Sequence, residues 1–442
     1  MLFSLPITLL IALPAVWAGP IYCTLKPPKS AVSSGSNSTG GGGGGKGNLT
    51  DVVATGWFAG WHGASYTPEN VTWSKYTALT YAFAVTTPDS SVLSLADSNE
   101  AQVPQFVDLA HQNGVAAHVS IGGWSGSQYF SSAVATAANR TLFVNAVLGL
   151  VSKYSLDGID FDWEYPSKQG IGCNIISSSD SANFLLMLQQ LRSQPAGKNL
   201  TLSAAVSITP FVGPNGTPMT DVSAFAAVLD YIEIMNYDVN GNWETTVGPN
   251  APLNDTCATI KEGSAVSAVN AWTAAKFPAN QIVLGVAGYG HSFLVPKASA
   301  VGPSGALVMN PPFTASQQPS GDAWSGDSTV TSTTVDQCGN PVGKDGVFNF
   351  WGLIDGGFLT ENGTAASGMV YTFDNCSQTP YVYNPTTQVL VSYDDARSFA
   401  AKGQFINDQQ LLGFSIWEVG GDYNNILIDA ISTSIGIVDV EC

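Results

Sequence analysis

Charged residues are scarce in this chain of 442 residues, and basic residues are the scarcest. Charged side chains make up only 11% of the sequence, and 33 acidic against 15 basic residues give a net charge of −18. A chain this acidic repels phosphate groups, so neither nucleic acid nor an anionic membrane is expected as a partner. Beyond residue 18 no apolar run reaches the ~18 residues of a membrane-spanning helix, so a soluble mature protein is expected.

Two patterns typical of metal sites are also missing, so no metal or other cofactor is expected. No two cysteines have C-x-x-C spacing, and the acidic segments lack the glycine-turned loop of an EF-hand. In a secreted chain the cysteines are expected to pair. We favour Cys173 with Cys257 and Cys338 with Cys376, because each pair falls in loops that we expect to be neighbours. Cys23 and Cys442 are left over.

The beginning of the chain predicts secretion. Residues 1–18 carry the apolar run Leu9–Leu13 and end in Ala18, as a secretory signal peptide does, although a charged segment before the run is missing. Residues 19–47 are rich in Pro, Ser and Gly and predict a flexible linker. Asn-x-Ser/Thr sequons fit a secreted glycoprotein and occur at Asn70, Asn139, Asn199, Asn254 and Asn362.

Short apolar runs rich in β-branched and aromatic residues alternate with longer amphipathic stretches over residues 52–435. There are eight such runs: Val52–Phe58, Leu79–Phe83, Val115–Ile121, Gly158–Trp163, Leu202–Ile208, Tyr231–Met235, Ile282–Val286 and Leu412–Ile416. Eight strands alternating with helices predict an α/β fold, the (β/α)8 TIM barrel. Runs seven and eight lie too far apart for one helix, so residues 297–378 are expected to form a small α+β insertion domain. It should project from the C-terminal face, where barrel active sites lie.

The fourth run contains the most informative feature, a concentration of carboxylates in an otherwise apolar strand. Because strand side chains alternate, Asp160, Asp162 and Glu164 share one face, opposite the apolar face of Ile159, Phe161 and Trp163. Like charges this close cannot all ionise, and an acid held protonated near neutral pH is what cleavage of a glycosidic bond requires. A calcium or magnesium site and a solvated strand face are weaker alternatives.

Polar and aromatic residues also follow the other runs. Run three ends in Ser120-Ile121-Gly122-Gly123-Trp124, run six in Met235-Asn236-Tyr237-Asp238, run seven in Gly288-Tyr289-Gly290-His291 and run eight in Trp417-Glu418. Aromatic platforms hold the flat CH faces of sugars. Those expected to converge on the mouth of the barrel are Trp57, Trp61, Phe83, Trp124, Tyr237, Tyr289 and Trp417.

These motifs resemble the family-18 glycoside hydrolases, specifically secreted fungal-type chitinases. The segment from Asp157 to Glu164 matches the signature D-G-x-D-x-D-x-E at every fixed position, and the other strand-end motifs occur in the family's order. The segment Tyr393-Asp394-Asp395 resembles the end of the chitinase insertion domain. The resemblance covers roughly residues 52–435.

The resemblance implies hydrolysis of β-1,4-linked N-acetylglucosamine polymers by a substrate-assisted retaining mechanism. Glu164 would be the general acid and base, Asp162 would orient the substrate acetamide, Asp160 would share a proton with Asp162, and Tyr237 would bond the acetamide oxygen. The implied substrate-binding residues are Asp238, Trp417, Trp124, Phe83, Met235, Tyr289, Gly123 and Tyr165.

Two departures from the family's pattern and two other functions are kept open. His291 stands where the family often has Arg, and the first strand reads Thr55-Gly56-Trp57-Phe58 where the family more often has Gly-Tyr, an aromatic exchange. A chitin-binding lectin on the same barrel usually lacks the equivalent of Glu164, which is present here. An endo-β-N-acetylglucosaminidase acting on N-glycans commonly lacks the insertion domain. A secreted monomer is expected; endo or exo action is not decided by the sequence.

Overall fold

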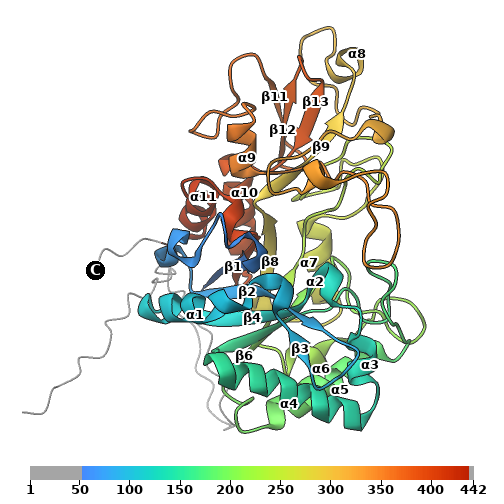
Figure 1. Ribbon diagram of the computed structural model, residues 1–442. Helices are drawn as coiled ribbons and strands as arrows, with labels where there is room; N and C mark the ends of the chain where they lie inside the picture. Colours follow the sequence, from blue (N-terminus) through green and yellow to red (C-terminus); the bar gives the residue numbers. More distant parts are fainter. Residues whose placement is uncertain (1–51, 438–442) are drawn as a thin grey trace, which may run out of the picture.

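The computed structural model describes residues 52–437, in which a closed barrel of parallel strands is the dominant feature (Figure 1). The strand order is β1-β14-β8-β7-β6-β5-β4-β2, and β1 pairs with both β14 and β2, which closes the ring. Each of the eight predicted runs forms one barrel strand, and the predicted (β/α)8 fold is confirmed. The strands are β1 Val53–Ala59, β2 Ala78–Thr86, β4 Ala116–Gly122, β5 Gly158–Asp162, β6 Thr201–Val206, β7 Tyr231–Ile234, β8 Ile282–Ala287 and β14 Gly413–Trp417.

Four sequence-based predictions fall outside the described residues: the signal peptide 1–18, the linker 19–47, Cys23 and Cys442. Within residues 52–437, no helix has both the length and the apolarity needed to cross a membrane.

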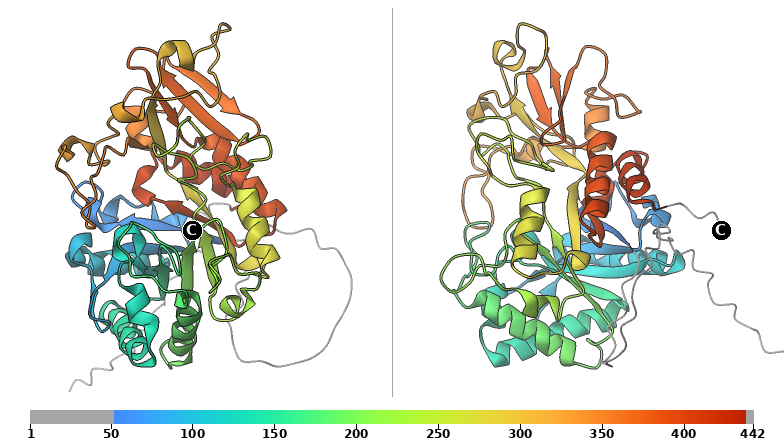
Figure 2. Two further views of the ribbon diagram at one scale, coloured as in Figure 1. Left: turned by 90° about the vertical axis from the view of Figure 1, so that its right-hand side faces the viewer. Right: turned by 180° about the vertical axis from the view of Figure 1, so that it is seen from behind.

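Helices cover the outside of the barrel (Figure 2). In the longest helix, α4, the side chains of Phe143, Val147 and Leu150 are buried at helical spacing, which places one apolar stripe against the strands. The side chain of Thr136 accepts a hydrogen bond from the Asn139 N–H and so caps the first turn. The helices are α1 Val103–Gln112, α2 Gly123–Gly126, α3 Phe130–Ala135, α4 Ala137–Tyr154, α5 Asp180–Ser193, α6 Ser223–Ala226, α7 Ala265–Ala274, α10 Ala396–Asp408 and α11 Ile426–Ile435; a short strand, β3 Leu93–Ser94, pairs with β2.

A second sheet stands beyond the barrel, at the top of Figure 1. Its antiparallel order is β10-β9-β13-β12-β11, and it carries the two short helices α8 Lys297–Ala300 and α9 Phe350–Asp355. Its strands extend from Tyr289 to Ser392, on both sides of the predicted range 297–378, because only Gly288 separates β9 from β8 and β9 pairs with β13. The strands are β9 Tyr289–Leu294, β10 Val347–Asn349, β11 Val370–Asp374, β12 Thr379–Asn384 and β13 Val389–Ser392.

The two disulfides predicted from the sequence are wrong, although the four cysteines are the right ones. Cys173 bonds Cys338, and Cys257 bonds Cys376. Each bridge joins a loop after a barrel strand to the insertion, across 165 and 119 residues respectively. The prediction gave each insertion cysteine the wrong partner because the loops that we expected to be neighbours are not the ones that the fold brings together.

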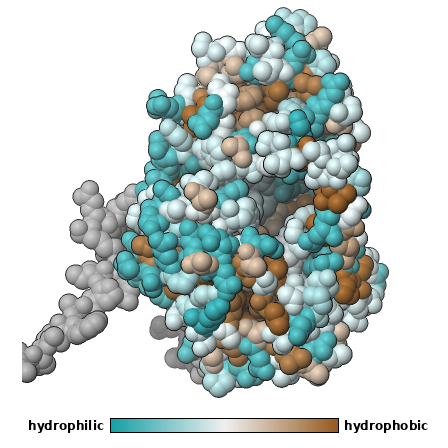
Figure 3. All heavy atoms as spheres, viewed as in Figure 1, coloured by the Kyte–Doolittle hydropathy of each residue, from teal (hydrophilic) through white to brown (hydrophobic). Residues whose placement is uncertain are grey.

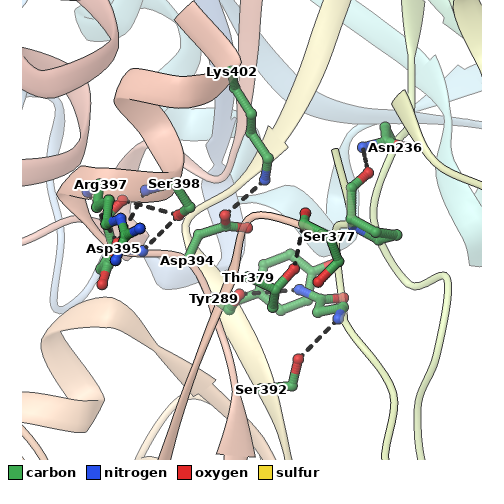
Figure 4. A network of polar contacts seen from close by, with 12 residues as sticks. Asn236, Tyr289, Ser377, Thr379, Ser392, Asp394, Asp395, Arg397, Ser398 and Lys402 are labelled. Atoms are coloured by element: carbon green, nitrogen blue, oxygen red, sulfur yellow. Dashed lines mark hydrogen bonds and ion pairs between the residues drawn. The ribbon is translucent and has the colours of Figure 1, made fainter. Parts of the chain in front are cut away.

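A buried ion pair fixes the second sheet to the barrel (Figure 4). Lys402 on α10 is fully buried, and its Nζ lies 2.7 Å from Oδ1 of Asp394, which follows β13. The neighbouring Asp395 caps α10 by accepting hydrogen bonds from the N–H groups of Arg397 and Ser398. The last residues of the insertion are thereby locked to a barrel helix.

Candidate active site

The acidic strand β5 directs its carboxylates into the barrel. Asp160 is fully buried and is reached by side chains from three other strands. Ser120 on β4 donates to Oδ2 at 2.6 Å, Ser203 on β6 donates to Oδ1 at 2.9 Å, and the Trp57 indole on β1 donates at 3.3 Å. These three donors hold the Asp160 side chain in a fixed orientation. On the other face of β5, Phe161 and Trp163 pack against Phe184 of α5.

Asp162 and Glu164 follow Asp160 toward the mouth of the barrel, and burial shifts both pKa values upward. The pKa of Glu164 rises to about 7, first because of burial and then because of the charge of Asp238. The pKa of Asp162 is well above its usual range because of burial, with the charges of Glu164 and Asp160 adding to it. Oδ1 of Asp162 is buried with no hydrogen-bond partner among residues 52–437. The site therefore holds protons that exposed carboxylates would have lost near neutral pH.

A fourth buried acid in this group, Glu233 on β7, was missed by the sequence reasoning. It is 1% exposed and lies beside Asp160 and Asp162. Burial and the charge of Asp160 hold its pKa well above the usual range, and Glu233 in turn contributes to the raised pKa of Asp162. The alternation of side chains along a strand could have revealed it, because a period of two places Glu233 on the same face as Met235 and Tyr237.

Above these acids a cleft of about 710 Å³ opens, which is visible as a hollow between the barrel and the second sheet in Figure 3. Part of the lining is aromatic. The ring of Phe83 stacks on Trp417 at 5.6 Å and 18°, and on Trp61 at 5.9 Å and 20°. Trp124 also lines the cleft, with half of its surface exposed. Flat apolar faces interrupted by a few acids form a surface suited to sugar rings.

Most of the predicted site residues line this cleft. Those that do are Asp162, Glu164, Tyr165, Met235, Tyr237, Asp238, Phe83, Trp124 and Trp417, whereas Asp160, Gly123 and Tyr289 lie behind the lining. Gly122, at the end of β4, allows β4 and β5 to approach each other closely. A Cβ on Gly122, whose φ is +117°, would lie 2.1 Å from the carbonyl oxygen of Asp162.

The residues after β7 and β8 meet at Asp238. Tyr289 donates from its hydroxyl to Oδ1 of Asp238 at 2.7 Å, and Nε2 of His291 lies 2.7 Å from the same oxygen. Tyr289 therefore supports Asp238 from behind, and His291 contacts the same carboxylate although it replaces the family's more usual Arg. Burial and the charges of Asp162 and Asp238 keep the pKa of Tyr237 well above its usual range, so its hydroxyl remains a donor.

A (β/α)8 barrel with an aromatic cleft over protonated acids at the C-terminal ends of its strands defines a glycoside hydrolase. The family model described as Glycosyl hydrolases family 18 matches residues 53–422, and the chain belongs to that family.

The similar proteins agree with this assignment. A "chitinase-like effector" from Moniliophthora roreri is 50% identical over 88% of this chain and 94% of its own length. Chitinase A1 from Niallia circulans is 31% identical over 70% of this chain and 41% of its own length. The crystal structure of a chitinase from Rhizomucor miehei superposes with a TM-score of 0.76, at 32% identity over 86% of this chain and 99% of that one.

Proposed function

We propose that this protein is a chitinase that cleaves β-1,4-linked N-acetylglucosamine chains with the help of the substrate's own acetamide group. The observation that carries the proposal is the pair formed by Glu164, whose pKa is about 7, and Asp162, whose buried Oδ1 has no hydrogen-bond partner within residues 52–437. The first is an acid still protonated near neutral pH, and the second is an acceptor for an amide N–H. Proteins similar to this one that are named chitinases support the same substrate.

In the proposed reaction the sugar whose glycosidic bond is cleaved lies over Trp417. Glu164 transfers its proton to the glycosidic oxygen as the bond between that oxygen and the anomeric carbon breaks. The acetamide carbonyl oxygen of the same sugar attacks the anomeric carbon and forms an oxazolinium ion. Asp162 accepts a hydrogen bond from its N–H, and Tyr237 donates to the acetamide oxygen. Glu164, now a carboxylate, removes a proton from a water molecule. The oxygen of that water attacks the anomeric carbon and opens the oxazolinium ring, so the configuration at the anomeric carbon is retained.

Asp160 acts through Asp162 in this proposal. Its three donors hold it in place next to Asp162, so one proton can be shared between the two acids. Asp238, held by Tyr289 and His291, is placed to bind the hydroxyls of the distorted sugar.

Glu164→Gln tests the proposal. The wild type should release N-acetylglucosamine oligomers whose new reducing ends are β-anomers, with a rate that falls as pH rises through about 7, because Glu164 must be protonated. The variant should bind the oligomers but turn them over about 10²- to 10⁴-fold more slowly. Binding without cleavage by the wild type would instead make the protein a lectin.

The lectin alternative is favoured by one observation, the name "chitinase-like effector" of a relative that is 50% identical. Against it, Glu164, Asp162 and Asp160 are all present and buried together.

The other alternative, cleavage of N-glycans, would be supported if a high-mannose glycoprotein were deglycosylated while chitin oligomers were left intact. We further propose that the protein acts as a secreted monomer; its size in solution and the N-terminal sequence of the exported protein test this.

A further inference from the structure

A histidine beside the aromatic part of the cleft has no role in the proposed reaction. His62 ends a short 3-10 helix, Gly60–His62, which directly follows β1. Its neighbour Trp61 lines the cleft and stacks on Phe83, whereas His62 lies behind this lining. An effect of His62 on a bound sugar therefore has to act through Trp61.

The contact between these two side chains requires one particular protonation state of His62. Nε1 of Trp61 donates to Nε2 of His62 at 3.0 Å. An indole nitrogen only donates, so Nε2 carries no proton while this hydrogen bond exists. The neutral imidazole with its proton on Nδ1 meets this condition. The imidazolium does not, because both of its ring nitrogens are donors. The hydrogen bond to Trp61 therefore depends on a neutral His62.

Two further contacts hold the His62 ring in place. The indole of Trp324 stacks on it, with ring centroids 4.0 Å apart and an angle of 12° between the planes. At the edge of the ring, Oε1 of Glu418 lies 3.5 Å from Nε2. Glu418 directly follows Trp417 and is buried. Nε2 of His62 thus lies between the indole of Trp61 and the carboxyl group of Glu418.

His62 and Glu418 are both neutral over a wide pH range. Burial lowers the pKa of His62 to about 4. Burial, and then the charge of Asp322, raise the pKa of Glu418 to about 8. Between these two values the contact joins two uncharged groups, and Nε2 can accept from Trp61. Below about pH 4 the imidazolium forms, which can donate to Glu418 but cannot accept from Trp61.

Three other titratable groups surround this pair. Asp322 comes from the insertion, Asp422 from the segment after β14 and Tyr66 from the segment after β1. Burial raises the pKa of all three, in the case of Asp422 to about 6. All three are acids, as Glu418 is, and an acid loses its charge or stays neutral as the pH falls. His62 is therefore the one group of these five that becomes charged on acidification.

We propose that His62 is a positioning residue for Trp61, and that it fixes the indole as a sugar platform only in its neutral form. Trp61 is 42% exposed, so its ring has room to turn unless a hydrogen bond holds it. A platform that is fixed before the sugar arrives lowers the entropy cost of binding. The inference rests on the proposed function and adds a pH dependence to it: below about pH 4, acid weakens substrate binding while Glu164 stays protonated.

The test measures binding apart from cleavage, in protein that carries Glu164→Gln. Calorimetry gives the dissociation constant of the N-acetylglucosamine hexamer at about pH 6 and about pH 3.5, on either side of the His62 titration. At the higher pH, adding His62→Phe should weaken binding about fivefold, because the new ring can stack on Trp324 but accepts no hydrogen bond. Adding His62→Gln should leave binding unchanged, since the carboxamide oxygen can accept from Trp61.

The lower pH separates the two protonation states of His62. Binding by the Glu164→Gln protein should weaken about twofold to threefold more on acidification than binding by the His62→Gln variant, which does not titrate at this position. Trp61→Phe is the matched control, because its ring has no N–H. In that variant the addition of His62→Phe should cost no further affinity.

Two results would overturn the inference. Full affinity in His62→Phe would show that Trp61 needs no acceptor, and an unchanged pH dependence in His62→Gln would assign the titration to another group. Thermal melts at both pH values check that each variant is folded, and if His62→Phe is not, the pH dependence of His62→Gln decides. Failure of the Glu164→Gln protein to bind the hexamer near pH 6 would contradict the proposed function itself, which separates the two failures.

Discussion

Two groups of buried carboxylates in this molecule differ in one respect, the presence of a cation. Asp394 at the base of the insertion is 3% exposed and faces the fully buried ammonium of Lys402. Asp162 and Glu164 are almost as buried, at 4% and 9%, and no salt bridge reaches either of them within residues 52–437. Burial raises the pKa in both places, but at Asp394 the charge of Lys402 opposes the rise. A paired acid joins two parts of the fold, whereas unpaired acids keep protons that can be transferred.

The largest effect is expected where the paired group is broken. Lys402→Ala leaves Asp394 buried without its cation, and removal of one partner of a buried pair typically costs about 3–5 kcal/mol of unfolding free energy. Denaturant unfolding of the folded enzyme measures this loss. Replacing both partners, in Lys402→Met/Asp394→Asn, should recover most of the stability. Lys276→Ala breaks the exposed pair with Asp221 and should leave stability nearly unchanged. Equal stability of Lys402→Ala and wild type would show that the pair holds nothing together.

Glu164→Gln should have the opposite effect on stability, which sharpens the comparison. The pKa of Glu164 is about 7 in the folded protein and 4.5 without burial, so the folded state binds this proton more tightly. The stability that this proton provides is full below pH 4.5 and is lost as pH rises through about 7. Glutamine stays neutral, so the variant should match wild type near pH 4.5 and exceed it at pH 8, by up to about 3 kcal/mol.

Melting temperatures of wild type and Glu164→Gln across this pH range measure the difference. A constant offset between the two proteins at every pH would contradict the raised pKa and point to a packing effect of the amide.

The contrast between the two groups was only half visible in the sequence. The period of two along β5 placed Asp160, Asp162 and Glu164 on one face, and the eight apolar runs gave every barrel strand. The pairing of Asp394 with Lys402 could not be predicted, because it depends on how α10 packs after β13. The disulfides failed for the same kind of reason, since Cys338 reaches Cys173 only through a loop that crosses between the insertion and the barrel.

Glu233 tests whether an unpaired acid matters when it does not touch the cleft. Burial and the charge of Asp160 hold its pKa well above the usual range. Glu233 also raises the pKa of Asp162. In the proposed mechanism Asp160 and Asp162 share one proton. Removing Glu233 should lower the pKa of this pair, so the acidic limb of the kcat–pH profile should move to lower pH, by less than about one pH unit.

Other titratable groups surround Glu233: Asp160 and Asp162 from β5, Tyr231 on its own strand, and Tyr237 just after it. Tyr231→Phe, which removes a neighbour with no charge near neutral pH, is the control and should not move the limb. A limb that stays fixed in Glu233→Gln would make this acid part of the packing alone.

The smallest effect is expected at Asp238, whose carboxylate two side chains contact. Tyr289 and His291 contact the same oxygen, each at 2.7 Å, so either one can hold Asp238 when the other is lost. His291→Ala should raise KM for the hexamer about twofold to fivefold and leave kcat nearly unchanged, because one hydrogen bond to a carboxylate is removed and Glu164 is untouched. Tyr289→Phe should behave alike, and the double variant should lose more than the product of the two single effects, since Asp238 then has neither contact. If His291→Ala instead lowered kcat as far as Glu164→Gln does, His291 would take part in proton transfer together with Glu164. The distinction between hydrogen-bonded carboxylates such as Asp238 and unpaired carboxylates such as Glu164 would then not hold.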